Sequence, residues 1–191
     1  KLDNNQALEL AGNLDLVNII KEYGGRIMVV NPSSDKWQEQ DLEDFRRLIG
    51  MGSSPTNVKV IGIGSGATFV NRQLAATELT GVIAGIVSID GEPGKICRLP
   101  VPAFIGGKNA AKAAKPYQTT SDSAPADPLQ KVVVNTDKKA SLETLFAEAW
   151  DKVLSANYRY NNLYRTFYTS RGIDNPEGVK NFELVSIPVF D

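Results

Sequence analysis

The stretch VKVIGIGSGATFVNRQL, from Val58 to Leu74, decides how the middle of this chain folds. Apolar residues typical of a strand are followed by glycines around one serine and then by a helical pattern. We therefore expect a strand at Val58–Ile61 and a helix at Ala67–Glu78. A strand that passes directly into a helix needs a tight turn, and glycine tolerates the crowded or positive-φ backbone of such a turn. The helix start then directs free N–H groups at the strand end, which favours a negative charge there.

Outward from this stretch, strand and helix patterns alternate through the first 107 residues. Such alternation predicts an α/β fold, in which a mostly parallel sheet lies between two layers of helices in a three-layer αβα arrangement. The expected elements are a helix in one or two pieces at Asn4–Tyr23, a strand at Arg26–Val30, a helix at Gln38–Ile49, the strand and helix of the opening stretch, and strands at Val82–Ile89 and Val101–Ile105.

The 191 residues suit a single domain. We expect residues 1–107 to form the core sheet and its helices, residues 108–170 to form a lid-like helical and aromatic insertion, and residues 171–191 to provide a final strand. The chain begins without Met and stops directly after an apolar run, so we expect it to be truncated at both ends. The later patterns predict a helix at Ala110–Lys115, a strand at Lys131–Asn135, a helix at Ser141–Leu154 with Ser141 as its N-cap, and a strand at Phe182–Phe190.

Composition excludes several classes of function. The net charge is −1, so no basic excess indicates nucleic-acid binding. No run of 18 apolar residues predicts a membrane span. The single cysteine, Cys97, excludes an internal disulfide and a cysteine cluster for zinc, and we expect neither a metal nor a cofactor. The chain has no histidine, so it cannot contain a complete Ser-His-Asp triad.

The glycine-rich turn allows three interpretations. The first is the nucleophile elbow of serine hydrolases, G-x-S-x-G, which the chain presents as Gly62-Ile63-Gly64-Ser65-Gly66. Both outer glycines are present, but Gly64 stands where the serine belongs and Ser65 follows one position later. One step around a tight turn swings a side chain through a large angle, so Ser65 does not simply take over the role of the nucleophile.

The second interpretation is the dinucleotide fingerprint G-x-G-x-x-G/A, matched by Gly62, Gly64 and Ala67. The acidic residue that this fingerprint requires after the next strand would be Asp90. A helix, a strand and a second helix precede the motif, whereas such a loop usually opens its domain. The third interpretation is a turn without any ligand, as in many α/β proteins.

Residues 54–71 resemble the segment around the nucleophile in polyhydroxybutyrate-depolymerase-like and feruloyl-esterase-like α/β-hydrolases. In that family a short polar turn leads into a strand, the elbow and a helix. Further similarities lie in Arg26–Pro32, which resembles the preceding strand, in Leu99–Gly107, which resembles the later strand with the substrate-side loop, and in Lys131–Asn162, which resembles a lid-like insertion of larger bacterial members. The resemblance covers roughly Arg26 to Asn162 and implies hydrolysis of a small-molecule carboxylic ester by acyl transfer.

The resemblance also implies roles for individual residues. Ser65 would be the catalytic serine, Asp90 the carboxylate that orients the base, and the backbone N–H groups around Gly64, Ser65 and Gly66 the oxyanion hole. The residues at Lys108-Asn109, where the family carries its acid, are not acidic. Either a missing segment or a second polypeptide supplies the histidine, or the chain is a catalytically impaired derivative. Independently of the resemblance, Asp90 also fits the role of a turn cap.

Two further features complete the candidates. Asn31 and Trp37 follow the expected strand at Arg26–Val30, on the edge where ligands bind in parallel sheets, so they are candidate binding residues. Trp37 fits equally well as an anchor for its own loop. The aromatic residues between Tyr158 and Tyr168 favour packing of a lid, or alternatively the surface of a non-catalytic interaction module.

Overall fold

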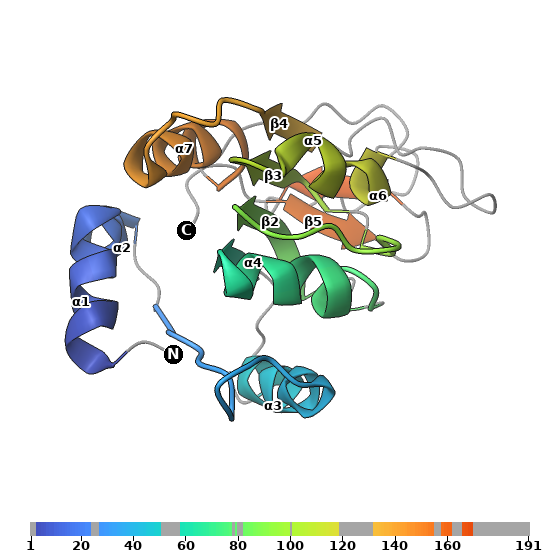
Figure 1. Cartoon of the computed structure of the whole chain (residues 1–191), viewed down its shortest axis with the longest axis horizontal. Helices are drawn as coiled ribbons and strands as arrows, with labels where there is room; N and C mark the ends of the chain where they lie inside the picture. Colours follow the sequence, from blue (N-terminus) through green and yellow to red (C-terminus); the bar gives the residue numbers. More distant parts are fainter. Residues whose placement is uncertain are drawn as a thin grey trace.

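The computed structural model describes most of the chain between Asp3 and Thr169 (Figure 1). The strand expected at Phe182–Phe190 lies outside the described residues. The described residues are 3–23, 27–50, 58–77, 79, 82–99, 101–118, 132–154, 158–161 and 166–169.

A four-stranded, wholly parallel sheet forms the centre of the molecule. Its strands follow the chain in consecutive order, and the labelled strands β4, β3 and β2 succeed one another from top to bottom in Figure 1. Because all strands run the same way, their carboxyl ends meet at one edge, where parallel sheets place their ligands. The strands are β1 (Val58–Ile63), β2 (Ile83–Ile89), β3 (Ala103–Gly106) and β4 (Val132–Asn135).

Helices cover both faces of this sheet, which confirms the predicted three-layer α/β fold. One hydrophobic core lies beneath α3 (Glu39–Gly50), the π-helical turn η1 (Val70–Leu74) and α5 (Ala110–Ala113). The short helix α4 (Ser65–Phe69) leads into η1, and its Phe69 contacts Phe45 of α3. A second core lies on the opposite face beneath α7 (Leu142–Ala149) and the π-helical turn η2 (Trp150–Leu154). The remaining helices are α1 (Asn4–Asn13), α2 (Leu16–Tyr23) and α6 (Lys115–Gln118).

The sequence of each strand explains its position in the sheet. All seven residues of β2 (IAGIVSI) are buried, as expected for an inner strand covered on both faces. The predicted cap of α7 is confirmed, because the Ser141 hydroxyl accepts the N–H of Thr144. The helix expected in one or two pieces at Asn4–Tyr23 forms in two pieces, which divide at Leu14–Asp15, where Asp15 has φ 55°.

The predicted strand at Arg26–Val30 is wrong for the residues that the structure describes. Residues 27–30 lie in no strand, and Ile27, Met28 and Val29 are exposed. Val30 packs at the margin of the core beneath α3. A continuous apolar run therefore did not identify a buried strand here, since such a run gives no information about which partner it finds.

Asp41 fixes the loop that follows this segment. Its carboxylate accepts the N–H of Ser33 at 2.8 Å and the N–H of Gln38 at 2.6 Å. Burial alone would raise the pKa of Asp41, but the hydrogen bonds from Ser33 and Gln38 outweigh it and hold the pKa below its ordinary value. The loop is thereby tied to the first turn of α3, in the helical layer.

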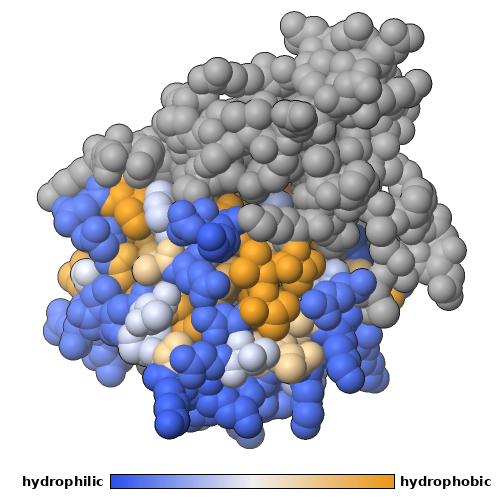
Figure 2. Space-filling model, turned by 90° about the horizontal axis from the view of Figure 1, so that it is seen from above, coloured by the Kyte–Doolittle hydropathy of each residue, from blue (hydrophilic) through white to orange (hydrophobic). Residues whose placement is uncertain are grey.

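The region expected as an insertion contributes to the core. β4 pairs with β3, and α7 packs against the sheet, so residues 132–154 belong to the main layers and not to a separate lid. Of the aromatic segment, β5 (Tyr158–Asn161) and β6 (Thr166–Thr169) form an antiparallel pair. Seen from above, apolar residues reach the surface in a patch between hydrophilic ones (Figure 2). Among the described helices, none has the length and apolarity that a bilayer crossing requires.

Candidate functional site

A sharp turn at Gly64 joins β1 to α4 at the carboxyl edge of the sheet. Gly64 has φ 58° and ψ −116°, a conformation that side-chain-bearing residues rarely adopt. Its N–H donates to the Ile89 carbonyl at 2.8 Å, and its carbonyl accepts the N–H of Thr68 at 3.0 Å. The apex is thus held by the end of β2 on one side and by the first turn of α4 on the other. The predicted bend from strand to helix at residues 62–66 is confirmed.

Gly62 permits the close crossing that this bend requires. A Cβ at Gly62 would lie 2.7 Å from the Ala67 Cα and 2.9 Å from the Gly66 carbonyl oxygen, both backbone atoms. No side chain fits there unless α4 moves away from β1. In contrast, a Cβ at Gly64 or Gly66 would meet nothing within 4 Å. Packing therefore requires a glycine at position 62, whereas at position 64 only the positive φ favours glycine.

Ser65 is the first residue of α4, one position beyond the apex, and it is exposed. Because Ser65 and Gly66 open the helix, their backbone N–H groups have no acceptor within it. No side chain caps this helix start. Among the described residues, no hydrogen bond joins the Ser65 hydroxyl to any side chain, Asp90 included. The structure does not pair the expected serine with the expected carboxylate.

Asp90 ends β2 and closes the neighbouring turn. It has φ 58°, and its N–H donates to the Gly106 carbonyl at 3.0 Å. Its carboxylate oxygen Oδ1 accepts the N–H of Lys108 at 2.9 Å. A Cβ at Gly107, which has φ 93°, would overlap this oxygen. The carboxylate of Asp90 therefore caps the turn that follows β3, the alternative role that the sequence left open.

A chain of hydrogen bonds that the sequence did not predict ties the segment after β2 to the elbow helix. Thr68 Oγ1 accepts the N–H of Glu92 at 3.0 Å, and Asn71 Nδ2 donates to the Glu92 carbonyl at 2.9 Å. Buried Tyr117 donates its hydroxyl to Asn71 Oδ1 at 2.8 Å, and Asn109 Nδ2 donates to Glu92 Oε1 at 2.9 Å. This network ties α4 and η1 to the segment after β2 and to α6.

Asn71 lies in the π-helical turn η1 and is buried. The Ala75 N–H donates to the Val70 carbonyl five residues earlier at 2.8 Å, which widens this turn of the helix. Burial raises the pKa of the Tyr117 hydroxyl well above its ordinary value, so the group stays a neutral donor to Asn71. The only sequence signal for this pair is a polar residue within an apolar helical pattern.

Trp37 packs against the first helix after the glycine turn. Its ring stacks on Phe69 with centroids 4.4 Å apart, so it anchors the loop before α3 to α4. Asn31 is half-buried and follows residues 27–30, which are not part of the sheet. The expectation that both residues lie at the carboxyl edge of a strand is therefore wrong, because that strand is not formed.

Two polar residues inside the strands also escaped prediction. Ser88 is 1% exposed, and its hydroxyl has no hydrogen-bond partner among the described residues. Lys59, on β1, donates from Nζ to the Leu154 carbonyl at 2.5 Å. Burial lowers the pKa of the Lys59 ammonium to about 7. Single polar residues within strands carry no spacing signal, which is why only the structure identifies them.

The described residues contain no group of three or more histidine, cysteine, aspartate or glutamate residues placed to hold a metal ion. Comparisons of the chain with protein-family models, with curated proteins and with solved structures found no match. The geometry of the site is therefore the basis for its interpretation.

Proposed function

We propose that the chain is a catalytically impaired derivative of an α/β-hydrolase, which keeps the turn that presents a nucleophile but not the nucleophile itself. The observation that carries this proposal is the apex residue. Gly64 occupies the positive-φ position between β1 and α4 where a serine hydrolase places its serine, and Gly64 has no side chain. The ligand class that the resemblance implies is a small carboxylic ester.

The surroundings of the turn support an impaired site over an active one. Ser65 begins the helix, and its hydroxyl has no hydrogen bond to a side chain among the described residues, while the chain contains no histidine. Asp90 directs its carboxylate to the backbone of Lys108 and so does not orient a base. An unactivated serine hydroxyl is a weak nucleophile at neutral pH, so acyl transfer at Ser65 would be slow.

A fluorophosphonate probe tests this proposal directly, because it labels only activated serines. We expect no labelling of the chain above that of its Ser65→Ala variant, and no hydrolysis of an aryl acetate above the rate of the same variant. Labelling that depends on Ser65 would overturn the proposal of an impaired site and show that the chain has an activated serine. Ser141→Ala serves as the control, since it removes a serine hydroxyl on α7 and leaves the glycine turn unchanged.

A dinucleotide site is a second candidate, favoured by the close crossing of Gly62 and Ala67, where a Cβ added to Gly62 would lie 2.7 Å from the Ala67 Cα. In the dinucleotide fingerprint, the first and last glycine positions allow this kind of close packing between strand and helix. Against it, the four described strands follow one another without a reversal of order, whereas dinucleotides bind where the order reverses. Titration with NADH, followed by the fluorescence of Trp37 and Trp150, distinguishes the two candidates, and we expect no saturable change.

A further inference from the structure

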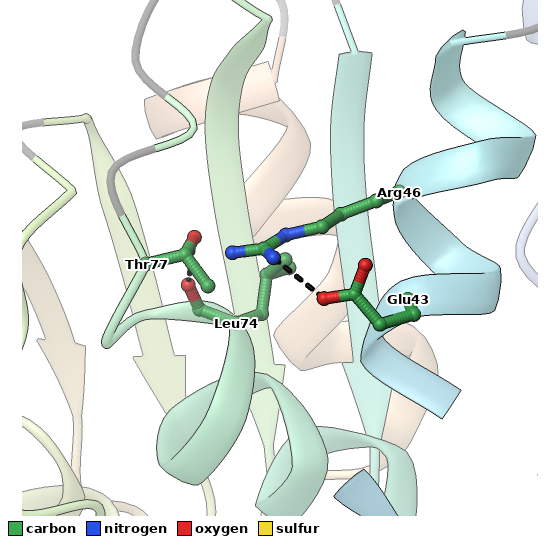
Figure 3. A network of polar contacts seen from close by, with 4 residues as sticks. All are labelled: Glu43, Arg46, Leu74 and Thr77. Atoms are coloured by element: carbon green, nitrogen blue, oxygen red, sulfur yellow. Dashed lines mark hydrogen bonds and ion pairs between the residues drawn. The ribbon is translucent and has the colours of Figure 1, made fainter. Parts of the chain in front are cut away.

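We draw no further inference here: the strongest candidate, the hollow between α3 and the far end of η1 that Arg46 and Thr77 line (Figure 3), carries nothing, because its two arginines already have partners and several residues that adjoin its lining in the sequence lie outside the described part of the chain.

Discussion

The residues that directly follow two neighbouring strands of the sheet have the same backbone φ but different side chains. Gly64 directly follows β1 and Asp90 directly follows β2, and both residues have φ 58°. At Gly64 the space for a side chain is empty to 4 Å and backbone groups hold the turn. At Asp90 a carboxylate fills the space and binds the backbone after β3. The turn after β1 is therefore open above its apex, whereas the turn after β2 is closed by its own side chain.

The largest expected effect concerns the packing that makes the open turn possible. Gly62→Ala should destabilise the fold by about 3 kcal/mol or more, because the new Cβ would contact backbone atoms of α4 that cannot rotate away. Gly66→Ala, four residues further along the same turn, has open space and should change stability by no more than about 1 kcal/mol. Urea denaturation of both variants measures the difference. Equal stabilities would show that α4 does not cross β1 as closely as described.

The closed turn should depend on the Asp90 side chain. Asp90→Ala removes the acceptor of the Lys108 N–H and leaves a β-carbon at positive φ, with an expected cost of about 2 kcal/mol. Asp90→Asn keeps an acceptor and tolerates positive φ, so it should cost less than about 1 kcal/mol. The midpoints of thermal unfolding rank these variants. If Asn and Ala are equally destabilising, the carboxylate charge and not the turn hydrogen bond is the important feature.

The open turn should tolerate a side chain at a smaller cost. Gly64→Ala meets no atom, so its penalty is only that of an L-residue at positive φ, about 1–2 kcal/mol. This cost should be below that of Gly62→Ala, although the two glycines are two residues apart. Denaturant midpoints of the two variants, measured side by side, sharpen the comparison. A Gly64→Ala penalty as large as that of Gly62→Ala would mean that the space above the turn is filled.

Sequence reasoning predicted the layers better than the site, for physical reasons. The alternation of apolar strands and amphipathic helices is a local property, and it correctly indicated β1, β2, β3 and the helices between them. The segment at 27–30 shares that local property but does not pair within the described residues, because pairing depends on a partner elsewhere in the chain. The strand and helix expected at Lys131–Asn135 and Ser141–Leu154 correspond to β4 and to α7 with η2. The sequence did not indicate that β4 pairs with β3 and that α7 packs on the second core, since these contacts also depend on partners elsewhere in the chain.

The polar site escaped prediction because its contacts join distant residues. Tyr117 and Asn71 are 46 residues apart, and Asp90 is 18 residues from Lys108, whose N–H it binds. No spacing rule connects such positions before the strands bring them together. The glycine turn was predictable, since strand, glycines and helix are contiguous. The residue at the apex of the turn was harder to predict. The direction of the Ser65 side chain depends on which residue forms the apex, and that residue is Gly64.

The smallest expected effect is at Ser65 itself. Ser65→Ala should change the free energy of unfolding by less than about 0.5 kcal/mol, because its hydroxyl is exposed and has no partner among the described residues. Replacing a serine that caps a helix would instead cost about 1 kcal/mol. Ser141→Ala on α7 provides that reference, because the Ser141 hydroxyl accepts the Thr144 N–H. Paired urea titrations compare the two serines. If Ser65→Ala costs as much as Ser141→Ala, then the hydroxyl of Ser65 caps α4, the helix starts one residue later, and Gly64 is no longer the apex of the turn.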